Sequence, residues 1–113
     1  MTKSLLPAAT ALPIHDLITP TEQGIASRVL AKTQGGNVTL FAFDSEQELS
    51  EHSAPFDALV WVLEGRIGFT VGGEPVEGGP ETLVRLPANV PHALKALESS
   101  RMLLVMLREP DAR

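Results

Sequence analysis

Hydrophobic positions recur with the two-residue period of β-strands along most of this chain. From Ile25 onward, two apolar-rich stretches, 25–32 and 37–44, flank "TQGG", whose Gly35-Gly36 pair suits a tight hairpin turn. Both alternating sets of the second stretch are largely apolar: Val38, Leu40 and Ala42 on one side, and Thr39, Phe41 and Phe43 on the other. The pattern predicts a strand that is covered on both faces.

Further short apolar runs follow, separated by turns rich in Gly, Pro and Asn. The segment "DSEQELSEHSAPFDA" is polar and is predicted to be a loop. We expect strands at 58–63, 66–71, 82–86, 92–97 and 102–108. At least seven short strands and no convincing internal helix predict an all-β sandwich or barrel. The last run, Leu103–Leu107, is unbroken and indicates a strand buried on both faces, which in a small barrel suggests subunit packing.

Residues 1–20 differ from the rest of the chain. They are interrupted by Pro7 and Pro13, yet carry apolar residues such as Leu5, Leu12 and Ile14. We interpret 1–20 as an N-terminal arm on a single barrel domain, 21–113, and not as a signal peptide. Apolar side chains on an arm need a surface to cover, either the barrel itself or a neighbouring subunit.

Composition narrows the partners and the compartment. The chain of 113 residues has fourteen acidic and nine basic residues, a net charge of −5. Because it also has no run of basic residues, we expect no nucleic-acid partner. The absence of cysteine excludes disulfides, thiolate metal sites and cysteine nucleophiles, and it fits a cytoplasmic location. No apolar run is long enough for a transmembrane helix. A chain this short leaves much apolar surface exposed, so we expect a homodimer.

Two segments resemble the motifs of a small single-domain cupin, the RmlC-like jelly-roll barrel of cupin type 2. "EHSAPFDALVWVLEGRIGFTVGGE" resembles the first motif, H-x-H, three or four residues, Glu, six residues, Gly. "LPANVPHALKAL" resembles the second, P-x-G, two residues, His, three residues, Asn. The resemblance runs from about Ile25 to Leu107. It implies a double-stranded β-helix, usually dimeric, with one central pocket that in many members holds a divalent metal.

Carried over residue by residue, the resemblance leaves two of four metal ligands. His52 matches the first histidine and His92 the histidine of the second motif. Four other motif positions differ: Ala54 replaces a histidine, Ala58 the glutamate, Asn89 a glycine and Ala96 an asparagine. Since zinc and non-haem iron sites need about three protein ligands, two histidines are too few to hold a metal tightly.

One carboxylate could complete the site. Asp57 stands next to the glutamate position, and a β-bulge before Ala58 would turn it inward to join His52 and His92. Strict alternation argues against this, because it places Asp57 outward with Leu59 and Trp61. Glu51, Glu64 and Glu81 are weaker candidates, since they fall in loops or turns.

Two functions therefore stand open. In the first, an apolar barrel pocket binds a small molecule, with His52 and His92 orienting it, Phe56 closing over it and Asp57 nearby. In the second, the protein is a metal-dependent oxygenase or isomerase with one Fe, Zn, Ni or Mn ion on His52 and His92. A protein without metal is equally plausible, and the sequence does not decide whether it is an enzyme.

Plainer roles compete with both functions. His92 could bond only to a backbone carbonyl, and His52 alone would be a solvated surface residue; their motif spacing favours a shared site. His15 has no partner in the pattern. Trp61 is interpreted as a barrel or dimer-interface residue. No serine nucleophile context such as G-x-S-x-G is present, so covalent catalysis is not expected.

Overall fold

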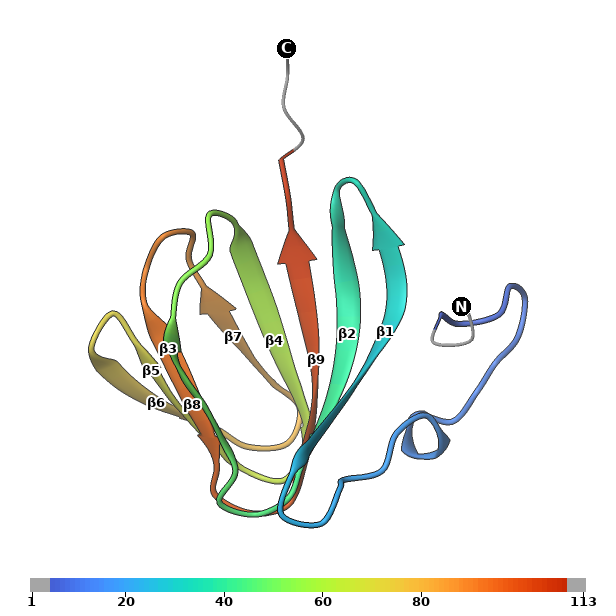
Figure 1. The fold of residues 1–113 in the computed structure, drawn as a ribbon, viewed down its shortest axis with the longest axis horizontal. Coiled ribbons are helices and arrows are strands. Elements are labelled where there is room, and N and C mark those ends of the chain that lie inside the picture. The colour runs from blue at the N-terminus through green and yellow to red at the C-terminus, as the bar shows by residue number, and fades with distance from the viewer. Residues whose placement is uncertain (1–4, 110–113) are drawn as a thin grey trace.

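The computed structural model describes residues 5–109, and Figure 1 shows two antiparallel β-sheets that face each other. The five-stranded sheet has the order β1-β2-β9-β4-β7, and the four-stranded sheet has the order β3-β8-β5-β6. The strands are β1 Ile25–Thr33, β2 Gly36–Phe43, β3 Glu48–His52, β4 Asp57–Glu64, β5 Ile67–Val71, β6 Glu74–Gly78, β7 Thr82–Leu86, β8 His92–Ala96 and β9 Ser100–Leu107. This architecture confirms the all-β jelly roll expected from the sequence.

The hairpin turns form where glycine permits a left-handed backbone. Gly65 joins β4 to β5 with φ +85°, and Gly72 and Gly73 join β5 to β6 with φ +57° and +85°. Gly36 opens β2 beside Met106, where an added Cβ would lie 1.8 Å from a carbonyl oxygen. These turns set the register of the sheets.

The interior between the sheets is a single apolar core. Alternate residues of each strand point into it, as Ala58, Val60 and Val62 of β4 do. They meet Ile67 and Phe69 of β5, together with the core residues Phe43, Leu86, Leu94, Ala96 and Met102. These side chains fill the space between the two sheets.

A second apolar cluster lies on the outer face of the five-stranded sheet. Leu40 and Ala42 of β2 are fully buried there beneath Ile18 of the N-terminal arm. The arm runs outside the barrel beside β1 and contains one short 3-10 turn, η1 Ile14–Asp16 (Figure 1). β2 is thus covered on both faces, as its alternation predicted.

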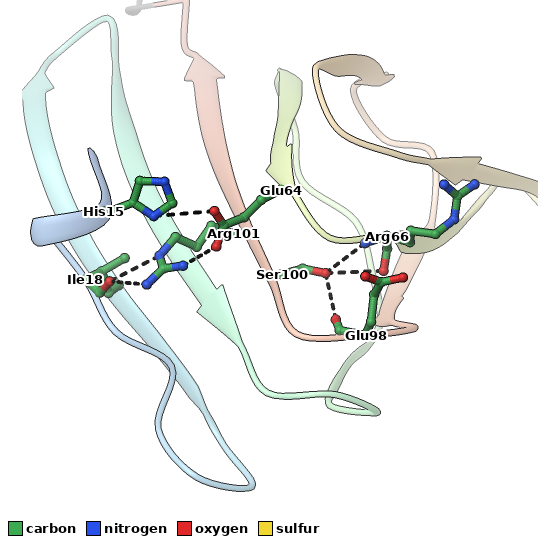
Figure 2. Close-up of polar contacts among 7 residues, drawn as sticks. All are labelled: His15, Ile18, Glu64, Arg66, Glu98, Ser100 and Arg101. Carbon is green, nitrogen blue, oxygen red and sulfur yellow. Dashed lines mark hydrogen bonds and ion pairs between the residues drawn. The ribbon is translucent and has the colours of Figure 1, made fainter. Parts of the chain in front are cut away.

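Two arginines of the barrel, Arg28 and Arg101, hydrogen-bond to backbone carbonyl groups of the arm and hold it on the outer face of the sheet. Figure 2 shows that Arg101 donates from Nε and Nη2 to the carbonyl oxygen of Ile18, at 3.2 and 3.1 Å. Its Nη1 pairs with Glu64, whose other carboxylate oxygen lies 3.5 Å from Nδ1 of His15. Arg28 donates to the carbonyl oxygen of Leu17. Glu64 is therefore part of the arm's attachment and does not face the barrel interior.

Two strands, β3 and β6, lie where no strand was predicted from the sequence. β3 occupies part of the segment predicted to be a polar loop, and that prediction was wrong. β6 follows the Gly72-Gly73 turn. Both strands are at sheet edges and pair on one side only, β3 with β8 and β6 with β5. An edge strand needs few apolar residues, which is why its sequence does not read as a strand.

Candidate histidine site at the barrel rim

His52 and His92 come together at the rim of the four-stranded sheet. They are cross-strand partners at the end of the β3–β8 pair. Their Nε2 atoms are 3.1 Å apart, and the rings meet edge to face with centroids 4.4 Å apart. His92 is 7% exposed and His52 is open to solvent, so the pair is accessible from one side.

A β-bulge in β3 makes this meeting possible. Leu49 pairs with Leu94 and His52 pairs with His92, so three steps along β3 match two along β8. In a regular strand, Leu49 and His52, three positions apart, would point to opposite faces of the sheet. β8 itself alternates regularly, with His92, Leu94 and Ala96 buried. The bulge therefore turns His52 to the same side as His92.

Each histidine ring is held through its other nitrogen. Nδ1 of His52 lies 2.8 Å from the carbonyl oxygen of Ser50, and Nδ1 of His92 lies 3.2 Å from that of Val90. A carbonyl oxygen only accepts hydrogen bonds, so these contacts favour the tautomer with the proton on Nδ1 in both rings. In neutral rings of this form, both Nε2 atoms, 3.1 Å apart, carry lone pairs that can accept hydrogen bonds.

The surroundings of His92 keep it uncharged. Burial lowers its pKa, the Val90 carbonyl raises it, and the neighbouring His52 lowers it, with a net pKa below the ordinary 6.5. A neutral imidazole is a hydrogen-bond acceptor, a metal ligand and a general base.

Asp57 is not brought to the histidines. The register of β4 with β7 and β9 is regular at its start, so the bulge that would have turned Asp57 inward is absent. Its carboxylate accepts hydrogen bonds from Nε and Nη2 of Arg85, at 3.2 and 2.9 Å, and from the backbone N–H of Ala88 at 2.8 Å. These hydrogen bonds hold its pKa below the ordinary value. The outward orientation predicted by alternation is the one observed.

Other carboxylates also stay away from the pair. Glu51 lies in the bulge and is exposed, and Glu81 is an exposed turn residue with φ +63°. Within residues 5–109, no group of three or more His, Cys, Asp or Glu side chains could hold a metal ion. Phe56 lies beneath the guanidinium of Arg108, whose Cζ is 5.3 Å from the ring centroid, and not beside the histidines.

The sequence of most of the barrel matches a known protein family. The family model described as "Cupin domain" matches residues 39–108. The chain belongs to the cupin family. No curated protein matches it. None of the helical segments among residues 5–109 could span a bilayer.

Solved structures similar to this cupin cover most of the chain. A conserved protein of unknown function from Streptococcus pyogenes is 31% identical over 94% of this chain and 93% of its own, with a TM-score of 0.88. A cupin superfamily protein from Desulfitobacterium hafniense is 28% identical over 92% and 95%, with a TM-score of 0.85. A Cupin 2 conserved barrel domain protein from Leptotrichia buccalis is 32% identical over 84% of this chain and 46% of its own, with a TM-score of 0.80.

Sequence reasoning found the histidines but missed their supports. The carbonyl groups of Ser50 and Val90 carry no sequence signal, because every residue has one. Arg85 could have been found, since the alternation of "TLVRL" puts it on the outer face, beside the outward Asp57.

Proposed function

We propose that this cupin binds a small molecule at the barrel rim, with His52 and His92 jointly accepting a hydrogen bond from one donor group. The observation that supports this proposal is the approach of two Nε2 atoms to 3.1 Å while both Nδ1 atoms face carbonyl oxygens. Two facing lone pairs repel each other. An ammonium group beside the pair can donate one hydrogen bond to each nitrogen, and a hydroxyl can share its one proton between them, so either group replaces the repulsion with attraction.

The apolar interior favours a ligand with an apolar body and one polar end. Ala58, where other cupins carry a glutamate, is part of the core, and Ala96 is fully buried. The histidine pair is then the polar end of a mostly apolar site, which is the usual composition of a small-molecule pocket. If the ligand is also a substrate, neutral His92 is positioned to take a proton from it as a general base.

A metal-dependent enzyme is the second candidate, favoured by the same nitrogen atoms. Two nitrogen ligands about 2.1 Å from one ion lie about 3 Å apart when they subtend a right angle, close to the observed separation. A divalent ion would supply Lewis acidity to a bound substrate. Because the described residues add no third protein ligand, the donor set does not complete a metal site.

Nitrogen-15 NMR of the histidine rings tests the proposal directly. At neutral pH we expect both rings of the pair as the Nδ1–H tautomer, with unprotonated Nε2. Fragments that carry a hydroxyl or ammonium group should shift these Nε2 signals, whereas matched ketones should not. The variant His92→Gln should lose the response, and His15→Gln, in the exposed arm, should keep it.

Two results would decide between the remaining alternatives. A ring found as the Nε2–H tautomer would mean that the histidines bond to each other, and the pair would then be structural. Saturable loss of both Nε2 signals with zinc, nickel, iron or manganese, and no response to donor fragments, would instead support the metal-dependent candidate.

A further inference from the structure

A hollow lies where four chain segments meet at one end of the five-stranded sheet. Its volume is about 830 Å³, within the range of small-molecule pockets. Neither histidine lines it. Its walls come from the β1–β2 turn, the start of β4, the loop after β7 and the end of β9, and consist of Gln34, Pro55, Phe56, Asp57, Ala88, Leu107, Arg108 and Glu109.

Arg108 is the one cationic side chain lining this hollow. Its guanidinium lies over the ring of Phe56, and its backbone N–H donates to the carbonyl oxygen of Gly35 at 2.7 Å, which fixes the end of β9 against the β1–β2 turn. Stacking on an aromatic face leaves the N–H groups at the edge of the guanidinium available. No carboxylate of residues 5–109 pairs with it.

The nearby carboxylates of Asp57 and Glu109 form no ion pair with the guanidinium of Arg108. Both oxygens of Asp57 are already occupied, one by Arg85 and the other by the N–H of Ala88. Glu109 is exposed and forms no ion pair with the guanidinium. Within the described chain, Arg108 is thus a cation held in place without a counter-ion.

We propose that this hollow binds a small organic carboxylate with a flat apolar body. Arg108 pairs with the carboxylate through two parallel N–H···O hydrogen bonds, the recognition that guanidinium geometry favours. Phe56, Pro55 and Leu107 contact the apolar body, and the Gln34 amide stands at the rim as a further donor. The site is separate from the histidine pair and does not depend on the ligand proposed there.

Benzoate is the probe, with neutral benzamide as its matched control. We expect benzoate to give saturable amide shifts in NMR spectra at Gln34, Ala88 and Arg108, and benzamide to bind about tenfold more weakly or worse, since it lacks the charge-assisted bonds. Arg108→Gln should weaken benzoate binding by a similar factor, and Arg108→Lys should restore part of it. Phe56→Leu should also weaken it.

Two controls separate this proposal from a general charge effect and from the histidine site. Arg66→Gln removes an exposed arginine of the other sheet, one that is paired with Glu77, and should leave benzoate binding unchanged. His92→Gln should also leave it unchanged. The proposal is overturned if benzoate gives no saturable shift, if benzamide binds equally well, or if Arg108→Gln binds benzoate like the original protein.

Discussion

At the scale of single residues, the chemistry of the rim depends on which ring nitrogen of each histidine carries the proton. The carbonyl groups of Ser50 and Val90, 2.8 and 3.2 Å from the two Nδ1 atoms, favour the tautomer with the proton there. These two backbone carbonyl groups therefore leave Nε2 of each histidine free to accept a hydrogen bond. A change of backbone conformation at Ser50 or Val90 would alter the site without replacing a histidine.

The depressed pKa of His92 makes stability depend on pH. Because the unfolded chain takes up a proton near the ordinary pKa of 6.5 and the folded protein only at lower pH, the stability contribution is complete above that pKa. It is lost as the pH falls from there toward the folded pKa. We expect urea unfolding between about pH 8 and pH 5 to show a shallower decline for His92→Gln than for the original protein. A His92→Gln profile parallel to that of the original protein would contradict the predicted role, and His15→Gln serves as the control.

Gly65 and Gly73 have the same φ of +85°. Replacing each with alanine therefore compares the cost of backbone strain alone with the cost of strain plus a steric clash. A Cβ on Gly65 would lie 2.2 Å from Oγ of Ser100 and 2.4 Å from the carbonyl oxygen of Ser99, whereas one on Gly73 would meet nothing within 4 Å. We expect Gly73→Ala to lower the free energy of unfolding by about 1 kcal/mol and Gly65→Ala by about 3 kcal/mol or more. Chemical denaturation measures both, and equal losses would show that strain alone acts.

At the scale of elements, the bulge in β3 matters more than any side chain of that strand. It adds one residue between Leu49 and His52 and so changes the face on which His52 lies. β3 is an edge strand with mostly exposed residues, so its register can change without disturbing the core.

Deleting Glu51 should remove the bulge and still leave the two histidines paired. Two steps along β3 then match two along β8, so regular alternation keeps His52 on the face of Leu49, opposite His92. The pKa of His92 should stay below its ordinary value, because burial and the charge interaction with His52 both remain. Histidine NMR titration measures this pKa, and Glu51→Ala, which keeps the bulge, is the control. A His92 pKa that rises to the ordinary value in the deletion variant alone would show that the pair depends on the bulge.

The elements predictable from the sequence are those with a buried face. Alternation located β2, β4, β7 and β9, because their inward residues are apolar. It also placed Asp57 outward. Motif spacing brought His52 and His92 together. β3 and β6 were missed because edge strands expose most of their side chains, and the bulge was missed because an extra residue in one strand is visible only against its partner.

At the scale of the whole molecule, the outer face of the five-stranded sheet is only half covered. The arm covers Leu40 and Leu30 over β1 and β2. Farther across the sheet the register aligns Leu103, Trp61 and Leu83, and the last two are 45% and 67% exposed. An aligned apolar row on an open sheet face is typical of a protein interface.

We expect two copies to associate through this row. Leu83→Glu should shift sedimentation toward the monomer with little loss of stability, because Leu83 buries little surface in the single chain. Val76→Glu, at an exposed apolar position on the other sheet, is the matched control and should not change the association. A protein that sediments as a monomer at every concentration would contradict this expectation.

The strand order has a consequence for synthesis on the ribosome. β9, the last strand of residues 5–109, lies at the centre of the five-stranded sheet, between β2 and β4. Until Ser100–Leu107 has left the exit tunnel, β2 and β4 each have a strand edge without a hydrogen-bonding partner. The apolar faces of the strands synthesised earlier also remain exposed to water. The five-stranded sheet can therefore form fully only after β9 has been synthesised. A message that ends early would therefore yield a product that exposes its sheet edges to aggregation and proteolysis.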